Sequence, residues 1–284
     1  MKILLLGSNG MLGHMIKQYL SEKEYEVFCT TRDKNDKYYY DVVANVNHIE
    51  EIIKDVKPSV VINCIGILNK QAEEDKSRAV LVNGYLPHYI DKLSELYKFK
   101  FIHISTDCVF DGANGEYIEG SFKDAKNFYG QSKAIGEVIN NRNVTLRTSI
   151  IGPDINEKGI GLFKWFMEQT EPISGYSKVV WTGVTTLQLA KCIEMIIKND
   201  VFGLFHVVNN KKIDKYELLQ LFKKYFRADM IINKAEDYIS DKSLINTNTS
   251  FDFCVSDYED MIIEMKNWIL SHEVLYEKLI KQIK

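Results

Sequence analysis

The stretch of residues 2–20, KILLLGSNGMLGHMIKQYL, decides the fold of this chain. Four consecutive apolar residues, Ile3 to Leu6, precede a glycine, and such a short uninterrupted run is typical of a strand that is covered on both faces. A secretory signal would need an apolar region of roughly 7 to 15 residues followed by a cleavage site, so this run is too short for one. We therefore expect a buried strand here.

Three glycines, Gly7, Gly10 and Gly13, follow this strand at intervals of three residues. Gly7 allows a sharp turn, Gly10 lets the backbone approach a pyrophosphate, and Gly13 permits close packing of the next helix on the strand. The N-terminus of that helix attracts the charge of a phosphate. Because strand, spacing and helix agree, the pattern predicts a dinucleotide cradle rather than an ordinary turn.

The residues after the second predicted strand bear on the choice of dinucleotide. An acidic side chain at this place would bind the ribose 2′-hydroxyl of NAD, whereas an arginine accommodates the 2′-phosphate of NADP. The sequence CTTRD, residues 29–33, offers Arg32 first, and a guanidinium pairs bidentately with phosphate. We predict NADP(H) as the cofactor, and Asp33 keeps NAD(H) possible.

Five short apolar runs alternate with helical periodicity in the first half of the chain, which predicts an α/β fold with a doubly wound parallel sheet. The predicted strands are 2–6, 26–30, 59–64, 100–105 and 144–147. We expect residues 1–151 to form the cofactor-binding domain, with later segments returning to it, and residues 152–284 to form mainly a smaller substrate-binding domain. In that second part the predicted elements are a helix over 161–169, a strand over 178–181, a helix over 185–198, a strand in 203–210, a helix over 215–226 capped by Asp214, and two closing helices from Asp257 onward.

Charge and cysteine content exclude several classes of partner. The 36 basic and 39 acidic residues nearly cancel and are spread along the chain, so no nucleic acid or membrane surface is expected as a partner. The five cysteines are odd in number and far apart, without the spacing of a zinc site, so we expect no metal and a reducing, cytoplasmic environment.

Two further motifs carry the chemistry: FIHISTDCVFDG at 101–112 and NFYGQSKAIGE at 127–137. Tyr129 and Lys133 are four residues apart, so on a helix they project from one face. A nearby ammonium favours the phenolate and would lower the pKa of Tyr129, which could then exchange a proton with a carbonyl oxygen. Thr106, at the C-terminal edge of the sheet, could hydrogen-bond the same oxygen. The combination predicts hydride transfer.

Together with LRTSIIG at 146–152 and GVTTLQLAK at 183–191, these motifs make the sequence resemble the extended short-chain dehydrogenases/reductases, most closely the dTDP-4-dehydrorhamnose reductase (RmlD-like) family. The resemblance implies a Rossmann-type sheet and a smaller C-terminal α/β domain that covers a nucleotide-linked sugar. It also implies that Thr106, Tyr129 and Lys133 match the family's catalytic triad, and that hydride is delivered to C4 of a 4-keto-6-deoxy sugar. We expect a monomer or a homodimer.

Motif and resemblance together predict two sets of binding residues. The cofactor site is expected to include Gly7, Asn9, Gly10, Met11, Leu12, Gly13, Arg32, Asp41, Val42, Cys64, Ile65 and Gly66. The substrate site is expected to include Asp107, Cys108, Ile150, Phe163 and Trp165. For the two aromatic residues, stacking on a base or sugar and packing in a helix core are equally compatible with the spacing. His14 and His103 are expected to be packing or surface groups.

Cys108 and Ile150 depart from the family's usual tyrosine and tryptophan at these positions, so the pocket is expected to differ and rhamnose itself is doubtful as the product. The expected substrate is a dTDP- or UDP-linked 4-keto sugar, for example an N-acetylated hexose on UDP, used for surface polysaccharide. Cys108 also leaves open a bifunctional epimerase-reductase, in which a cysteine two residues after the catalytic hydroxyl abstracts a proton. That chemistry also uses a histidine from the substrate-binding domain, and His206, which lies there, is expected to be a satisfied strand residue. A non-catalytic NADP-binding regulatory subunit is the third alternative.

Overall fold

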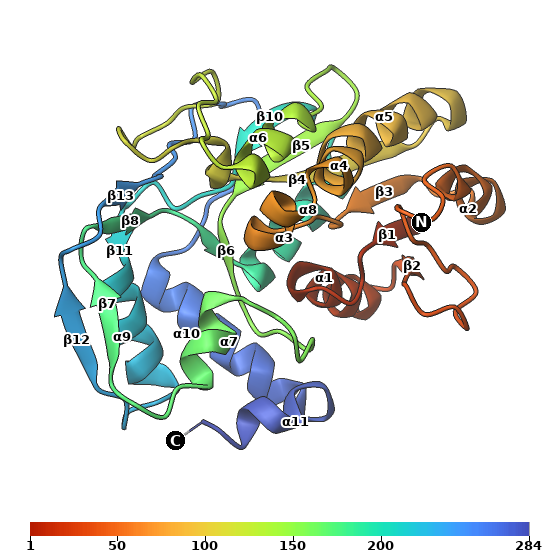
Figure 1. The fold of residues 1–284 in the computed structure, drawn as a ribbon. Helices are drawn as coiled ribbons and strands as arrows, with labels where there is room; N and C mark the ends of the chain where they lie inside the picture. Colours follow the sequence, from red (N-terminus) through yellow and green to blue (C-terminus); the bar gives the residue numbers. More distant parts are fainter. Residues whose placement is uncertain (284) are drawn as a thin grey trace.

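The computed structural model describes residues 1–283 and is built on a six-stranded, fully parallel sheet with helices on both faces (Figure 1). The strand order is β10-β5-β4-β3-β1-β2. The strands are β1 Lys2–Leu6, β2 Glu26–Thr30, β3 Val60–Asn63, β4 Lys100–Thr106, β5 Val144–Thr148 and β10 Gly203–His206. The strand order reverses at β1, because β2 lies on one side of β1 and β3 and the later strands lie on the other. Ligands of such sheets bind at this switch point between β1 and β3, at the carboxyl ends of the strands. The predicted fold class is confirmed.

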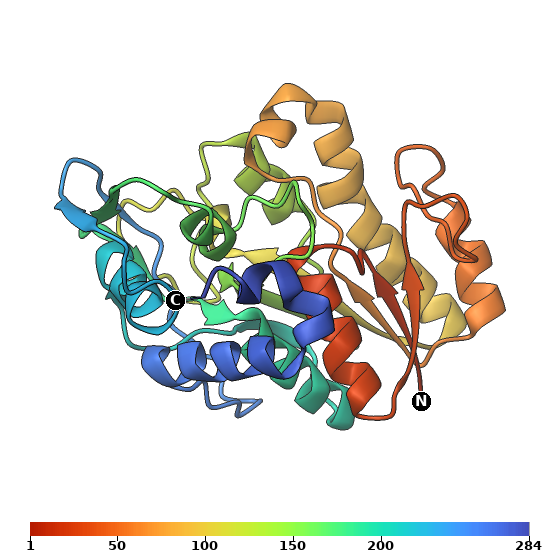
Figure 2. The ribbon, with the colours of Figure 1, turned by 90° about the horizontal axis from the view of Figure 1, so that it is seen from below.

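Strand β1 is apolar throughout because both of its faces are covered. Ile3 and Leu5 face one core, which α1 (Met11–Glu22) and α8 (Thr186–Lys198) share, and Leu4 and Leu6 face a second core with α2 (His48–Val56) and α5 (Leu86–Tyr97). Figure 2 shows α1 and α8 on one side of the sheet and α5 on the other. A two-sided core removes the polar alternation that a half-exposed strand would have.

Elements from both halves of the sequence build the central sheet. Helix α8 packs beside α1, and β10 pairs with β5 in parallel register, from Gly203 against Val144 to His206 against Arg147. Most elements after β5 form a smaller α/β part with three short sheets, β11-β8-β13, β12-β7 and β6-β9, the first two of which lie at the left in Figure 1.

That smaller part has the following elements. Its strands are β6 Ile150–Ile151, β7 Ile173–Tyr176, β8 Val179–Trp181, β9 Val184–Thr185, β11 Ile213–Asp214, β12 Ile232–Ala235 and β13 Ser240–Asp241. Its helices are α7 Leu162–Met167, α9 Lys215–Tyr225, α10 Tyr258–Ser271 and α11 Glu273–Ile280. Asp214 caps α9 as predicted, in a reciprocal capping box with Glu217.

The helical region that leads into α5 is interrupted by a π-helical turn. A short α4 (Lys76–Ala79) is followed by a single π-helical turn, η1 (Val80–Tyr85), and only then by α5. The buried Asn83 lies in this turn, with its amide bonded to both backbone groups of Ile67 and to the Ser132 hydroxyl. A π-turn of this kind is frequent at functional sites.

Short helices complete the cofactor half, namely α3 (Asn69–Glu74), the 3₁₀ turn η2 (Asp107–Val109) and α6 (Phe128–Ile135). Within residues 1–283, no helix combines the length and apolar character that crossing a membrane would require.

Candidate active site

The glycine cradle between β1 and α1 has the shape that a dinucleotide pyrophosphate needs. Gly7 adopts φ +79°, in the left-handed region that favours glycine. The backbone amide of Gly10 donates a hydrogen bond to the Gly7 carbonyl oxygen at 3.1 Å, which closes the turn. A Cβ at Gly13 would lie 2.1 Å from the Gly7 carbonyl oxygen, so this position must stay a glycine. A Cβ at Gly10 would meet only that oxygen, at 3.5 Å, so the outer side of the turn is open.

Helix α1 begins at this opening, and its first turn has no acidic residue and no side-chain cap. Its positive end is therefore free for an anion. The turn after β3 lies against the cradle, since a Cβ at Gly7 would lie 3.2 Å from backbone atoms of Cys64 and Ile65. These residues fit a bound dinucleotide.

Three other predicted cofactor residues lie beyond the cradle. Arg32 is exposed directly after β2, where it is available to a phosphate. Val42 is buried, and Asp41 is half-buried with its Oδ1 accepting a hydrogen bond from the Val43 amide at 3.0 Å.

Thr106 and the helix that carries Tyr129 meet at the carboxyl end of β4. Asn127 caps α6, its Oδ1 accepting from the Gly130 amide at 2.8 Å. A Cβ at Gly130 would lie 2.0 Å from the Cys108 carbonyl oxygen, so glycine lets α6 press against the turn that follows Thr106. Thr106 Oγ1 accepts from the Cys108 amide and donates to Asp107 Oδ1, both at 3.1 Å.

Tyr129 is buried at this contact and keeps its proton. Burial is the main cause that raises the pKa of Tyr129, the neighbouring Cys108 adds to it, and a hydrogen bond with Thr106 opposes it. The predicted net lowering of the Tyr129 pKa is wrong for this structure, because desolvation is the dominant effect and the net shift is upward. At neutral pH the phenol is therefore an acid that can donate a proton, which is the role a reduction requires.

Lys133 lies one helical turn after Tyr129 and is also buried. Its Nζ donates to the carbonyl of Ile104 at 2.7 Å and lies 3.4 Å from His103 Nε2. Burial lowers the pKa of Lys133 to about 8, while the charges of Glu137 and Cys64 act in the opposite direction. The amine can thus change its protonation state in the pH range where the site would work.

A family model described as the RmlD substrate binding domain matches residues 1–243. The chain belongs to the RmlD family. The resemblance expected from the motifs is thereby confirmed.

Several proteins similar to this RmlD-family chain have named functions. It is 25% identical over 222 residues to the spore coat polysaccharide biosynthesis protein SpsK of Bacillus subtilis, which covers 76% of each chain. It is 31% identical over 155 residues to a dTDP-4-dehydrorhamnose reductase of Aggregatibacter actinomycetemcomitans, covering 52% of this chain and 51% of the relative. It is 23% identical over 233 residues to methionine adenosyltransferase 2 subunit beta of Xenopus tropicalis, covering 76% of this chain and 70% of the relative.

Solved structures agree on the fold. A dTDP-4-dehydrorhamnose reductase from Clostridium acetobutylicum superposes with a TM-score of 0.81 at 23% identity, covering 95% of this chain and 100% of that one. The corresponding enzyme of Bacillus anthracis, in complex with NADP, superposes with a TM-score of 0.78 at 22% identity, covering 93% and 98%.

In this member of the RmlD family, Cys108 is poorly suited to abstract a proton. Burial and the adjacent Asp107 raise the pKa of the thiol to about 12, so it stays protonated and un-nucleophilic.

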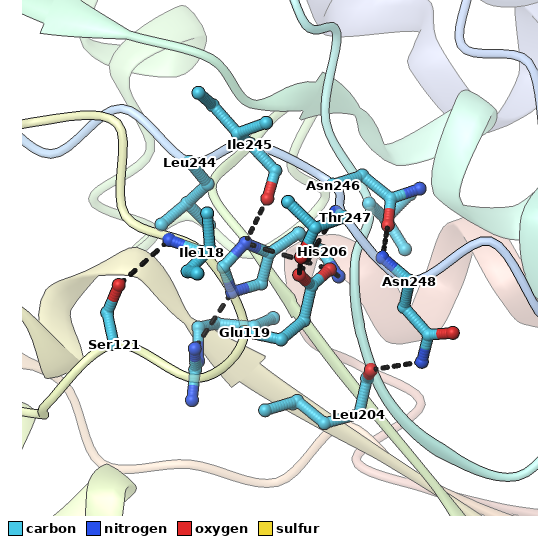
Figure 3. Close-up of polar contacts among 12 residues, drawn as sticks. Ile118, Glu119, Ser121, Leu204, His206, Leu244, Ile245, Asn246, Thr247 and Asn248 are labelled. Atoms are coloured by element: carbon cyan, nitrogen blue, oxygen red, sulfur yellow. Dashed lines mark hydrogen bonds and ion pairs between the residues drawn. The ribbon is translucent and has the colours of Figure 1, made fainter.

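The two histidines after residue 152 are held elsewhere. His206 lies on β10, where its Nε2 is 2.8 Å from Arg147 Nη1 and its Nδ1 is 2.9 Å from the Ile245 carbonyl oxygen (Figure 3). His272 stacks on Trp268 and contacts Glu22, at the end of α1 remote from the cradle. The expectation that His206 is a satisfied strand residue is confirmed.

The predicted substrate residues divide into three groups. Asp107 is buried and Cys108 and Ile150 are half-buried, and the first two lie directly after Thr106. Trp165 is 39% exposed on α7 and stays a prediction. The prediction for Phe163 needs correction: its ring is fully buried against Phe222 and Phe226, with centroid distances of 5.2 and 4.7 Å, because α7 turns this face into the core.

Lys215, the first residue of α9, is a further residue near this site that was not predicted from the sequence. Its Nζ lies 4.7 Å from the centroid of the Trp181 ring, and electrostatic interactions with Asp107 and Cys108 favour its charged form. Burial lowers the pKa of Lys215 to about 8. The capped helix start at Asp214 located the residue, but only the fold shows that this helix end faces the turn after β4.

Proposed function

We propose that this protein reduces the 4-keto group of a dTDP- or UDP-linked 4-keto-6-deoxy sugar with NADPH, in the synthesis of surface polysaccharide precursors. The observation that carries the proposal is the buried contact of Thr106 with Tyr129, one helical turn from Lys133, at the same sheet edge as the glycine cradle.

The chain is an NAD(P)H-dependent reductase of sugar nucleotides, as its membership of the RmlD family and its reductase relatives indicate. The exposed Arg32 after β2 supports NADP(H), because a guanidinium can pair with the 2′-phosphate. The chain's relation to SpsK supports a role in polysaccharide synthesis.

The side chains of the site supply the proton half of the reaction. When bound, the nicotinamide supplies a hydride to the carbonyl carbon. Tyr129 donates its phenolic proton to the carbonyl oxygen, which converts the C=O double bond to a C–OH group, and the Thr106 hydroxyl holds that oxygen in place. The ammonium form of Lys133 stabilises the phenolate that remains until Tyr129 regains a proton.

A regulatory subunit is the second candidate, and one observation favours it: the likeness to methionine adenosyltransferase 2 subunit beta. Retention of Thr106, Tyr129 and Lys133 favours the reductase, because a binding subunit needs no buried proton donor. The bifunctional epimerase is disfavoured by the high pKa of the Cys108 thiol.

The test mixes the purified protein and NADPH with a panel of enzymatically generated dTDP-, UDP- and GDP-linked 4-keto sugars. Oxidation of NADPH is followed by the absorbance of the reduced nicotinamide. We expect turnover with at least one dTDP- or UDP-linked sugar. Protein that binds NADPH but oxidises it with no sugar would contradict the proposal and favour the regulatory subunit.

A further inference from the structure

Two buried polar side chains, Asn63 and His103, form a line of contacts that ends at Lys133. Asn63 ends β3 and His103 lies on β4, and the two are paired in the parallel register of these strands. Both are fully buried. Asn63 Nδ2 lies 3.3 Å from His103 Nδ1, and His103 Nε2 lies 3.4 Å from Lys133 Nζ, so the three form a continuous chain.

The first link of this chain fixes where the imidazole proton lies. Asn63 Oδ1 accepts a hydrogen bond from the Ile65 amide at 3.0 Å, and only the oxygen of an asparagine can accept. Its NH₂ group must therefore face His103 Nδ1, which has to be the acceptor. In a neutral imidazole the proton is then on Nε2.

The second link places that Nε2–H group against Lys133. An ammonium has only donors, so a charged Lys133 would put two donors against each other, whereas a neutral amine has a lone pair that accepts from Nε2–H. The amine still donates to the Ile104 carbonyl at 2.7 Å. Every polar contact among Asn63, His103 and Lys133 is therefore satisfied when Lys133 is neutral.

We infer that Asn63 and His103 are positioning residues of the active site, which hold Lys133 in place and favour its neutral amine through the tautomer of His103. Because Asn63 also holds the Ile65 amide, the proton state of Lys133 is linked to the turn at Cys64–Gly66 that flanks the cofactor cradle. The effect on turnover rests on the proposed function, but the effect on the titration of Lys133 does not.

Three surrounding groups act electrostatically on the Asn63–His103–Lys133 chain. Glu137, two residues after the end of α6, favours the charged lysine but is itself paired with Arg147, at 2.8 Å. Cys64, after β3, acts in the same direction as Glu137. His88 on α5 acts on His103, whose pKa burial holds well below its ordinary value, so the imidazole is neutral across the working range.

Asn63→Asp tests the link because it reverses the proton order. A carboxylate accepts from the Ile65 amide with one oxygen and requires a proton on His103 Nδ1 facing the other. Nε2 then becomes an acceptor for the Lys133 ammonium, and the lysine should titrate at a pH at least one unit higher. His103→Gln should shift it in the same direction, since the side-chain carbonyl can turn toward the ammonium.

His88→Gln is the matched control. It makes the same substitution at a solvent-exposed imidazole, whose Nε2 contacts the Ile135 carbonyl at 2.7 Å rather than Lys133. We expect no shift in the titration of Lys133 in this variant.

The measurement is an NMR titration of protein labelled with ¹³C at the lysine Cε, with the Lys133 signal assigned by its loss in Lys133→Met. We expect an unaltered chain to titrate near pH 8 and both Asn63→Asp and His103→Gln to titrate higher. Identical titrations in the unaltered chain and either folded variant would overturn the inference, as would an equal shift in His88→Gln. If Asn63→Asp does not fold, His103→Gln decides alone.

The alkaline limb of the pH profile of kcat/KM should move to higher pH together with the titration of Lys133, because the proposed reaction uses the charged form of this lysine. If no sugar is reduced, the proposed function fails while the NMR titration still decides the role of Asn63 and His103. If sugars are reduced but the limb stays in place in both variants, the proposed function stands and the inference fails.

Discussion

The glycine cradle lies at the same edge of the sheet as the catalytic corner, the contact of β4 with α6 that holds Thr106, Tyr129 and Lys133. Different physical effects shape the two regions. The cradle depends on backbone conformation and steric space: Gly7 at a positive φ, and Gly13 with no room for a Cβ. The corner of β4 and α6 depends on buried groups whose proton states are set by desolvation, with Tyr129 kept as a phenol and Lys133 titrating near neutral pH. Substitutions should therefore fail in different ways: by shape in the cradle, and by proton transfer in the corner.

Tyr129→Phe gives the largest expected effect and isolates the corner. Removing the hydroxyl removes the proton donor while leaving the ring's packing, so turnover should fall by about 10²- to 10⁴-fold. NADPH affinity, measured by fluorescence titration, should change by less than about twofold, because the phenol is not part of the cradle. Turnover close to that of the unaltered chain would exclude Tyr129 as the acid.

Gly13→Ala probes the cradle with a single methyl group. Its Cβ would lie 2.1 Å from a backbone oxygen that cannot move without breaking the turn, so we expect a loss of about 1–3 kcal/mol in unfolding free energy and weaker NADPH binding. The matched control is Gly10→Ala, whose Cβ would make an ordinary contact at 3.5 Å and whose φ is −85°. Equal unfolding free energies for the two variants, measured by urea denaturation, would show that the cradle is not held by steric fit.

Arg32→Ala sharpens the cofactor assignment. Losing a guanidinium pair with the 2′-phosphate should weaken NADPH by about tenfold, corresponding to roughly 1.4 kcal/mol, and leave NADH nearly unchanged. Dissociation constants for both cofactors measure the difference. Parallel losses for NADPH and NADH would place Arg32 outside the 2′-phosphate site.

The network at His206 is a buried polar cluster with no assigned chemistry, and it should affect stability alone. Burial holds the pKa of His206 below its ordinary value, so below pH 6.5 the unfolded chain binds a proton that the folded one does not. Stability should fall as the pH drops, with a slope from this one group of at most about 1.4 kcal/mol per pH unit. Urea denaturation of the unaltered chain and of His206→Gln should show a shallower slope in the variant, and equal slopes would contradict this origin.

The difference between cradle and corner also explains what the sequence could predict. Glycine spacing after an apolar run encodes steric requirements directly, so the cradle, the six strands and the doubly wound sheet could be predicted. The spacing of Tyr129 and Lys133 placed both residues on one helix face, but the direction of their pKa shifts depends on burial, which appears only after folding. The burial of Phe163 and the π-turn at Asn83 could not be predicted from local sequence patterns for the same reason. Their partners in the fold, such as Phe226 and Ile67, are distant in the sequence.

The positions of Asn63, His103 and Lys215 make the same point. His103 was expected to be a packing group because its neighbours are apolar, and only strand register brings it between Asn63 and Lys133. Lys215 belongs to a helix that the sequence predicted well, yet its proximity to Asp107 arises from the arrangement of two separate parts of the fold.

The central claim is that Tyr129 and the bound dinucleotide together reduce a ketone at C4 of a nucleotide-linked sugar. Its most direct test supplies NADPH carrying deuterium at the transferable position of the nicotinamide and locates the label in the product by NMR. The account predicts deuterium at C4 of the sugar and, in a companion reaction in heavy water, none at C3 or C5. Solvent deuterium at C3 or C5, or no label transferred to any sugar, would contradict it.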